Sequence, residues 1–598
     1  MRSPPEHLDG VTWDAVNRVF VAKVLSEFAH ERLISPEPHS EGKVYTLFAD
    51  EGMVVYRFRA TVRGLDHWGV QEESIEKRRG NIPEPLDAAA LILELKGALG
   101  IPPGVIGPYL EEINATLAGL AYRYKYQRFD ARALAEAEFQ DIEASMSAGH
   151  PCFVANGGRI GFDEDEYRTF APETGQTFPL VWLAADRSRA HFASIGGVSY
   201  DAFIREELGE SLLEAFCARI RSHGRDPKAY LLMPVHPWQW ANKLLTAFAG
   251  EIAQGHLIYV GEGEDRYQPQ QSIRTLFNRS RPERPYVKTS LSILNMGFMR
   301  GLSPEYMATT PAINEWVANF IEKDDLLKVR GFAVLREFAT VGYRNPTFER
   351  GTPAGNAYRK MLSALWRESP GTKTKPRQQL MTMAALLHRD RNGDALLPVL
   401  IERSQLKPQA WLRQYLDVYL APLLHCFYVH QLAFMPHGEN VILVLEDGVP
   451  VRVFLKDIGE EVLFFDAKER LPRGVRRIAL DVPDDVRVLS ILTDVFDGFL
   501  RFLAHTFAEH TSCGEGEFWR CVAECIHGYQ KTQSDFQKDF ERFDLFAPAF
   551  KRLCLNRMQL ENNAQLLDLS NPVASFKYAG DLENPLAEFR RAFGFPTK

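Results

Sequence analysis

Apolar positions change their spacing several times along the first part of the chain, and each spacing predicts a different element. Helical spacing in Trp13–Glu31 and Leu86–Leu99 predicts two helices. Between them, Val44–Phe48 and Val54–Phe58 alternate as the strands of a small hairpin would. We therefore expect a mixed first region in which helices dominate.

Near residue 150 the pattern becomes β-rich. Residues 149–162 place Gly157-Gly158 between two short apolar runs, which predicts a hairpin. Further β-rich runs follow at Tyr230–Val235, Leu257–Val260 and Tyr286–Leu294. The polar stretch at residues 367–377 is rich in Pro and Gly, so it predicts a boundary between this region and the rest of the chain.

Beyond that boundary, helices surround one pair of strands. Gln414–Met435 is apolar but holds charged and imidazole side chains, so we expect a buried helix and no membrane span. Val441–Leu445 and Val451–Leu455 flank Glu446-Asp447-Gly448, which predicts a tight β-hairpin. A long helical tail is expected from about Asp485 to Leu567.

Composition narrows the class of protein. At 598 residues the chain is too long for one hydrophobic core, so three or four structural units are expected. The net charge of −8 argues against non-specific binding to nucleic acid or to an acidic membrane. Seven cysteines, and an N-terminus without an apolar signal segment, indicate a cytoplasmic protein without disulfides. Cys513, Cys521 and Cys525 lie close together, but core packing explains them better than a metal site does.

The strongest chemical signal is the loop Met435–Asn440 ahead of the predicted hairpin. Because a hairpin returns to its starting point, Asp457 should lie beside Glu439 and Asn440. Such oxygen ligands suit Mg²⁺, which is usually shared with substrate phosphates. Protein kinases build a metal site from a loop asparagine and a later aspartate, so the pattern indicates nucleotide chemistry. The alternative is the ordinary polar end of a hairpin.

Cations and hydroxyl groups gather between positions 272 and 300. Ser272, Arg274 and Thr275 come together, Lys288 lies on the next expected strand, and Arg300 follows. Arginine grips phosphate or carboxylate through a planar fork, whereas lysine acts as a compact charge. The set predicts an anion-binding face, with a solvated strand face as the alternative. A second polar cluster lies on the predicted hairpin near residue 150 and consists of His150, Asn156 and Arg159.

These clusters, in this order, resemble the NRPS-independent siderophore (NIS) synthetases of the aerobactin synthetase type, along the full length of the chain. The matching pieces are residues 149–151 with 156–162, 232–240, 271–275, 287–302, and 437–440 with 456–457. Within that family, Met296–Gly301 and Cys554–Arg557 are most similar to the desferrioxamine and alcaligin synthetase branch.

The resemblance implies a hand-shaped α+β enzyme with antiparallel sheets, a helical C-terminal part and a palm distantly similar to kinases. The implied parts are a thumb at residues 1–170, β-rich ATP-binding fingers at 171–375, and a palm at 376–598. The resemblance also implies a homodimer.

It further implies an activity. Family members use ATP and Mg²⁺ to convert a carboxylate into an acyl-adenylate, release pyrophosphate, and then let an amine attack to form an amide. In this branch both groups belong to an N-hydroxy-N-succinyl diamine of the cadaverine or putrescine type. Joining such units and closing the ring gives a hydroxamate siderophore of the desferrioxamine, bisucaberin, putrebactin or alcaligin type.

On this basis each polar cluster receives a role. Arg300 and His437 are expected to hold the reacting carboxylate against the α-phosphate, because positioning and fixed cations do most of such work. The triphosphate is expected to contact Ser272, Arg274, Thr275, Lys288 and Asn440, the metal Glu439, Asn440 and Asp457, and the acyl substrate His150, Asn156 and Arg159.

Two other functions stay open at this point. A small-molecule phosphotransferase fits the kinase-like hairpin alone, and it would release ADP in place of AMP and pyrophosphate. A protein that binds a siderophore without turnover is the third possibility. It is disfavoured because so many partly buried charges are seldom kept unless something uses them.

Overall fold

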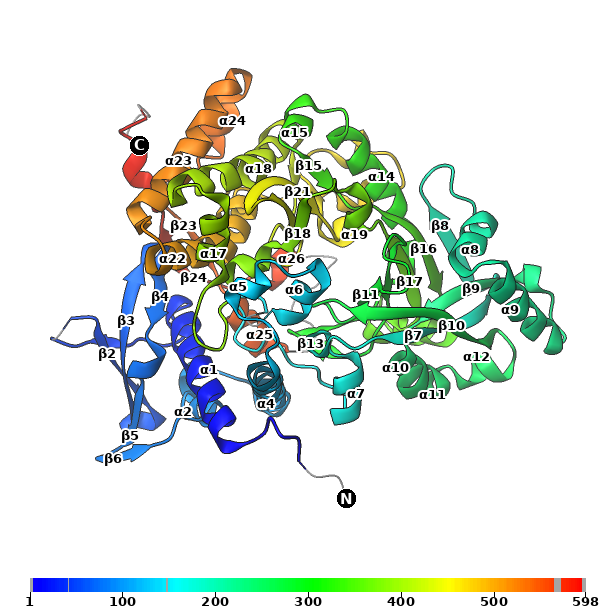
Figure 1. Ribbon diagram of the computed structural model, residues 1–598, viewed down its shortest axis with the longest axis horizontal. Helices are drawn as coiled ribbons and strands as arrows, with labels where there is room; N and C mark the ends of the chain where they lie inside the picture. The colour runs from blue at the N-terminus through cyan, green and yellow to red at the C-terminus, as the bar shows by residue number, and fades with distance from the viewer. Residues whose placement is uncertain (1–3, 41, 147–148, 564–571, 594–598) are drawn as a thin grey trace.

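The computed structural model describes residues 4–40, 42–146, 149–563 and 572–593. These residues form helices and mostly antiparallel sheets, arranged as an N-terminal lobe (blue), a second lobe around a large sheet (green) and a C-terminal lobe (yellow to orange) (Figure 1). Each lobe contains its own hydrophobic core. The predicted α+β class is therefore confirmed.

The N-terminal lobe packs helices against a small antiparallel sheet. Helix α1 (Gly10–His30) is capped by Asp9, whose carboxylate accepts a hydrogen bond from the amide of Thr12 at 2.9 Å. The predicted first helix and hairpin are confirmed, whereas the second predicted helix is interrupted at Leu95. The other elements are β1 (Glu37–Pro38), β2 (Val44–Ala49), β3 (Val54–Arg63), β4 (His67–Val70), β5 (Glu76–Arg79), β6 (Ile82–Glu84), α2 (Ala88–Glu94), α3 (Lys96–Leu99) and α4 (Pro103–Tyr126).

An eight-stranded antiparallel sheet forms the second lobe, in the order β8-β16-β17-β12-β11-β10-β7-β9. Phe203 of α8 (Tyr200–Leu208) and Phe216 of α9 (Glu210–Ser222) are buried in the core of this sheet. The predicted strands are confirmed, but the run from Tyr286 is a continuous strand only as far as Thr289. The strands are β7 (Phe178–Asp186), β8 (Ala190–Ser194), β9 (Tyr230–Val235), β10 (Leu257–Pro269), β11 (Thr275–Asn278), β12 (Tyr286–Thr289), β16 (Glu337–Tyr343) and β17 (Ser363–Arg367).

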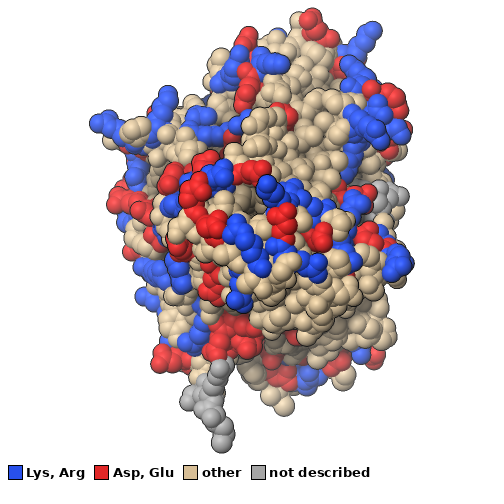
Figure 2. Space-filling model, turned by 90° about the vertical axis from the view of Figure 1, so that its right-hand side faces the viewer, with Lys and Arg blue, Asp and Glu red and all other residues tan. Residues whose placement is uncertain are grey.

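The outer end of this lobe is a charged surface. Figure 2 shows that Lys and Arg side chains are interspersed with Asp and Glu side chains on this face. The cations of the predicted anion-binding cluster do not belong to this surface, because Arg274 and Lys288 are buried.

The C-terminal lobe is organised around the predicted hairpin. Asp447 (φ 48°) and Gly448 (φ 82°) form a two-residue turn in which both residues have positive φ, as a type I′ turn requires. The predicted hairpin and buried helix are confirmed. The main elements are β15 (Phe332–Val334), β18 (Gln378–Thr382), β20 (Val441–Glu446) and β21 (Val449–Leu455), with the helices α14 (Thr310–Ile321), α17 (Leu396–Ser404), α18 (Pro408–His430), α22 (Arg501–His510) and α23 (Glu515–Thr532).

The expected helical tail is only partly helical. Helices α22 and α23 confirm its first part, and Cys513 and Cys521 are packed in the hydrophobic core. The prediction is wrong at β23 (Ala549–Leu553), which pairs with β24 (Tyr578–Glu583). Burial there alternates with period two, because every second side chain faces inward. The expected end at Leu567 lies outside the described residues.

Residues 149–162 do not form the predicted hairpin. The amide of Val154 donates to the side chain of Asn556 at 2.9 Å, and Ile160 pairs with Leu294 of β13 (Leu294–Asn295). The partners that replace a hairpin ladder in this segment thus come from distant elements. Such partners are invisible to a local pattern, which is why the prediction was wrong.

The three predicted domain ranges stay predictions. Residues 367–377 do connect β17 of the large sheet to β18 of the four-stranded sheet. However, β15 precedes this stretch and already pairs with β21. Leu134 and Ile142, in the predicted thumb, pack in the core of the C-terminal lobe.

A buried ionic network joins the N-terminal and C-terminal lobes. The guanidinium of Arg501, on α22, lies 2.7 Å from Glu27 of α1 and 2.9 Å from Asp497. His30 of α1 lies 3.2 Å from the same Asp497. Because a buried charge without a partner is costly, these contacts hold α1 against α22.

Replacing Arg501 with methionine should lower the free energy of unfolding by about 3–5 kcal/mol, since Glu27 and Asp497 would be left buried without their cation. Urea unfolding followed by circular dichroism measures this. The control is Arg413→Met, which removes a solvent-exposed pair with Glu524 (3.0 Å) and should cost at most about 1 kcal/mol. Equal losses in the two variants would contradict the role of the network.

Candidate active site

A cavity of about 370 Å³ is lined by residues from all three lobes. Most of the residues predicted from the sequence line it, namely His150, Ser272, Arg274, Lys288, Arg300, His437, Glu439, Asn440 and Asp457. The two predicted strands are adjacent as expected, since Thr275 of β11 lies opposite Lys288 of β12. Of the three cations, only Lys288 lies within this pair, and Arg274 directly precedes β11. The tertiary structure thus gathers residues that are far apart in the sequence.

Two predicted residues support the cavity wall from behind. Thr275 is buried in β11, and its hydroxyl accepts a hydrogen bond from Ser272 at 2.8 Å. The side-chain Nδ2 of Asn156 donates to the backbone carbonyl of His150 at 2.9 Å. These contacts orient Ser272 and His150, which do line the cavity.

Arg159 is also held by neighbours and does not line this cavity. Its guanidinium donates to Asn295 at 2.9 Å and lies 3.4 Å from Glu173. It lines a much smaller hollow beside the cavity, which it shares with Arg300 and Glu439. A direct contact between Arg159 and a substrate therefore stays a prediction.

The hairpin brings its two ends together as predicted. The amide of Lys456 donates to the carbonyl of Asn440 at 3.0 Å, so Asp457 returns next to the loop. Gly438 is required within the loop, because a Cβ there would lie only 2.9 Å from the Cα of Ala384. The backbone thus positions the loop before any ligand binds.

Asp457 is the centre of a buried ion-pair cluster. Its carboxylate lies 2.8 Å from Lys288 of β12 and 3.3 Å from Arg367 of β17. Burial alone would raise the pKa of Asp457, but these two cations outweigh it and hold the pKa below its ordinary value. Sequence reasoning missed Arg367, because residues 367–377 predict a boundary between regions and not a site.

Three further carboxylates surround this cluster. Lys288 lies 3.5 Å from Glu460 and 3.8 Å from Glu337. Asn440 donates a hydrogen bond to Glu461. Burial, followed by the nearby charge of Asp457, raises the pKa of Glu461 well above its ordinary value. Sequence reasoning missed Glu460 and Glu461, although they follow Asp457 by three and four positions.

This donor set fits Mg²⁺. Asn440 and several carboxylates offer oxygen atoms to one cavity. Throughout the described ranges, however, no three of these carboxylates bring their oxygens within 4.8 Å of one another. The cluster is therefore not a closed metal cage, as expected for an ion that is partly held by phosphate groups.

The cations and imidazoles of the cavity have unused hydrogen-bonding atoms. Within the described part of the chain, Nε of Arg300, Nδ1 of His437 and Nδ1 of His150 are buried without a hydrogen-bond partner. The two imidazole rings lie 5.2 Å apart, centre to centre. Buried polar groups are normally satisfied, so these atoms indicate the place of a polar ligand.

Electrostatics favours anions in this part of the cavity. Burial, and then the nearby Arg274, lower the pKa of Arg300 to about 10, so it keeps its charge at neutral pH. Burial lowers the pKa of His150 and of His437, which makes both imidazoles neutral at that pH. The cavity thus offers fixed cations for anions and neutral imidazoles beside them.

Comparisons with known proteins identify the family of this chain. Residues 138–388 match the IucA / IucC family, and residues 409–568 match the Ferric iron reductase FhuF-like transporter family. Putrebactin synthase from Shewanella sp. (strain MR-4) is 46% identical over 594 residues, which cover 99% of this chain and 94% of that protein.

Solved structures show the same fold. Aerobactin synthetase IucC from Klebsiella pneumoniae superposes with a TM-score of 0.85 at 28% identity, covering 97% of this chain and 100% of that one. The petrobactin biosynthesis protein AsbB from Bacillus anthracis gives 0.87 at 25% identity, covering 98% of both chains. This confirms the predicted hand-shaped synthetase fold.

The chain belongs to the IucA / IucC family, as its overall identity to putrebactin synthase shows. The predicted class, an amide-forming siderophore synthetase, is confirmed by this membership. Among the described residues, no helix is both long and apolar enough to cross a membrane.

A further buried carboxyl group lies beside this site and was not predicted. Glu112 of α4 accepts a hydrogen bond from the amide of Met296 at 2.7 Å. Burial raises its pKa to about 7, despite the hydrogen bonds and the nearby charge of Arg300 that oppose this. Because a carboxyl with a raised pKa binds its proton more tightly in the folded state, ionising it destabilises the fold.

We expect wild type to lose stability relative to Glu112→Gln as the pH rises from about 5 to 8, because only wild type must ionise this group. The free energy of unfolding of wild type should fall by up to about 3 kcal/mol relative to that of the variant. Urea unfolding at several pH values measures this difference. The matched control is Glu111→Gln, an exposed neighbour on the same helix, which should show no such trend. A pH-independent difference between wild type and Glu112→Gln would refute this assignment.

Proposed function

We propose that this protein is an ATP-dependent siderophore synthetase that activates the carboxylate of an N-hydroxy-N-succinyl diamine and joins it to an amine. Repeated condensation and ring closure would give a macrocyclic hydroxamate. The relation to putrebactin synthase, over nearly the whole chain, supports this type of product. The diamine is proposed to be of the putrescine or cadaverine type.

The observation that carries the proposal is the set of unsatisfied polar atoms around the cavity. A carboxylate and a triphosphate repel each other, so a ligase must hold both anions with fixed cations. Arg274, Arg300 and Lys288 all line the cavity and supply this charge. Nε of Arg300 and Nδ1 of His437 lack partners in the described structure and can receive the carboxylate.

Each group then has a defined task. Arg300 and His437 hold the reacting carboxylate, while Ser272, Arg274 and Lys288 contact the phosphates. Thr275 and Asn156 act indirectly, through their hydrogen bonds to Ser272 and His150. His150 and Arg159 are proposed to face the acyl chain.

Mg²⁺ would be held by Glu439, Asn440 and Asp457, with Glu460 and Glu461 close by. When bound, it would neutralise phosphate charge and favour departure of pyrophosphate. Lys288 and Arg367 now satisfy Asp457, so these cations must share or yield that carboxylate when the metal nucleotide enters. A homodimer and a cytoplasmic location are further expectations of the same proposal.

The nature of the products tests the reaction. With ATP, Mg²⁺ and N-hydroxy-N-succinylputrescine or N-hydroxy-N-succinylcadaverine, we expect AMP, pyrophosphate and oligomers that have lost one water per amide bond. Chromatography of the nucleotides and mass spectrometry of the products measure this. Release of ADP would favour the alternative of a small-molecule phosphotransferase. Retention of the substrate without ATP use would favour a binding protein.

Replacing Arg300 with alanine should reduce pyrophosphate release roughly 100- to 1,000-fold, because it removes a fixed cation from the reacting groups. The fold should persist, as judged by circular dichroism. Arg266→Ala, on the exposed part of β10, is the matched loss of one arginine and should leave the rate unchanged. Near-normal turnover in Arg300→Ala would exclude the assigned role.

A further inference from the structure

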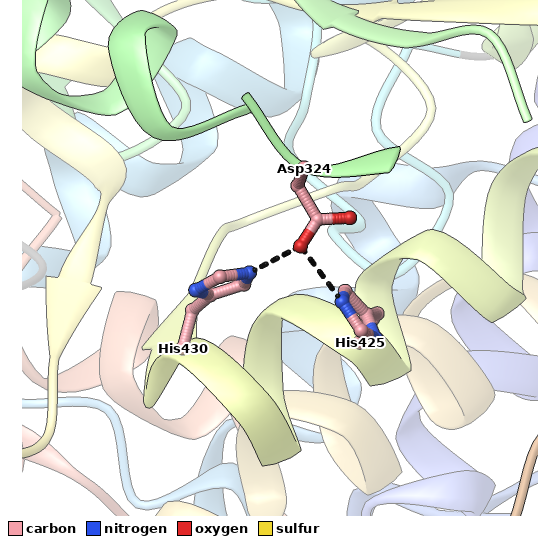
Figure 3. Close-up of side chains that lie close together, drawn as sticks. All are labelled: Asp324, His425 and His430. Atoms are coloured by element: carbon pink, nitrogen blue, oxygen red, sulfur yellow. Dashed lines mark hydrogen bonds and ion pairs between the residues drawn. The ribbon is translucent and has the colours of Figure 1, made fainter. Parts of the chain in front are cut away.

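A second cluster of ligand-type side chains lies away from the cavity. Asp324 precedes α15 (Asp325–Val329), and His425 and His430 belong to the last turns of α18. Figure 3 shows both imidazole rings directed at the carboxylate of Asp324. Nε2 of His425 lies 3.0 Å, and Nε2 of His430 2.9 Å, from the same oxygen, Oδ2. None of these residues lines the proposed active-site cavity.

The surroundings hold these three groups in place. Oδ1 of Asp324 accepts a hydrogen bond from the amide of Leu327 at 3.0 Å, which leaves Oδ2 facing the imidazoles. Nδ1 of His425 lies 3.2 Å from the hydroxyl of Tyr529, and the ring of His430 packs against Phe320 at 4.8 Å. Metal-binding histidines commonly have such a partner on their second nitrogen, because it orients the ring.

We propose that Asp324, His425 and His430 bind one divalent first-row transition-metal ion of the Zn²⁺ type. Their three ligand atoms lie within 4.8 Å of one another. Among the described residues, no other group of three His, Cys, Asp or Glu side chains meets this condition. Ligand atoms of a tetrahedral zinc site are about 3.3 Å apart, given bonds of about 2.0–2.1 Å. The distances from each Nε2 to Oδ2 are now 2.9–3.0 Å. Small side-chain rotations would therefore widen them enough to admit the ion.

The ligand types select the class of metal. Two imidazoles with one carboxylate suit Zn²⁺, Fe²⁺ or Co²⁺, whereas Mg²⁺ prefers oxygen ligands alone. The exposed fraction of the His430 side chain is 26%, against 7% for His425, so the cluster is open on the His430 side. Three protein ligands with one open side leave room for a water molecule as the fourth ligand.

The position of the cluster links it to the active-site loop. Helix α18 ends at His430, and the chain then passes through β19 (Leu432–Ala433) to Met435 and His437. Asp324 leads through α15 to β15, which pairs with β21 ahead of Asp457. An ion here would join the two segments that approach the cavity from the C-terminal lobe.

Titration of the tag-free full-length protein with Co²⁺ in excess Mg²⁺ tests the proposal. We expect one Co²⁺ per chain, with visible absorption bands of a nitrogen- and oxygen-ligated ion, and displacement by Zn²⁺. Zn²⁺ should also raise the melting temperature, since binding to the folded state alone stabilises it.

Asp324→Asn should reduce the Co²⁺ affinity at least tenfold. Asparagine can still accept the hydrogen bond from Leu327, so α15 keeps its N-terminal cap. His430→Ala is a second variant at the more exposed ligand. The control is His223→Ala, an exposed histidine at the end of α9, which should bind as wild type does.

Two outcomes would overturn the proposal. Absence of Co²⁺ and Zn²⁺ binding in wild type would identify the cluster as a hydrogen-bonded clamp between α15 and α18. Equal binding by wild type and Asp324→Asn would place the ion elsewhere. Neither outcome affects the synthetase proposal, because release of AMP and pyrophosphate is measured separately with Mg²⁺.

Discussion

The buried ion pair between Lys288 and Asp457 is the contact on which the site depends. It joins β12 of the eight-stranded sheet to the end of the hairpin in the C-terminal lobe, at 2.8 Å. Arg367 of β17 reinforces it at 3.3 Å. Two charges removed from water are stabilising only when their geometry is good and their other atoms are satisfied. The relative position of the two lobes is therefore restricted by this contact.

The same contact explains why the cavity is prepared for charged ligands. Lys288 is surrounded by Asp457, Glu337 and Glu460, so its positive charge is shared among several carboxylates. An incoming polyanion with its cation can replace some of these partners without leaving a charge uncompensated. A site of this kind exchanges one set of ion pairs for another, which costs less than creating them from solvated groups. Stability and ligand binding thus use the same side chains.

The N-terminal lobe is joined to the C-terminal lobe by a second network of buried ion pairs. Arg501, Glu27 and Asp497 bring α1 against α22, and these residues also lie near the cavity, where Arg501 and Asp497 form part of the wall. Burial of these groups in low-dielectric surroundings makes each pairing specific, because a wrong partner would leave a charge unpaired. All three lobes therefore meet at the cavity, and paired charges lie at both of these junctions.

The sequence by itself determined the local elements and the chemical types of the donors. Asp447-Gly448 specified a type I′ turn, which placed Asp457 beside Asn440, because such geometry depends on a few adjacent residues. Only the tertiary structure decided the partners: Lys288 and Asp457 are separated by 169 positions, and Glu112 was not predicted at all. Long-range pairings, like the pairing that overturned the predicted hairpin at residues 149–162, depend on how the lobes dock, which no local pattern contains.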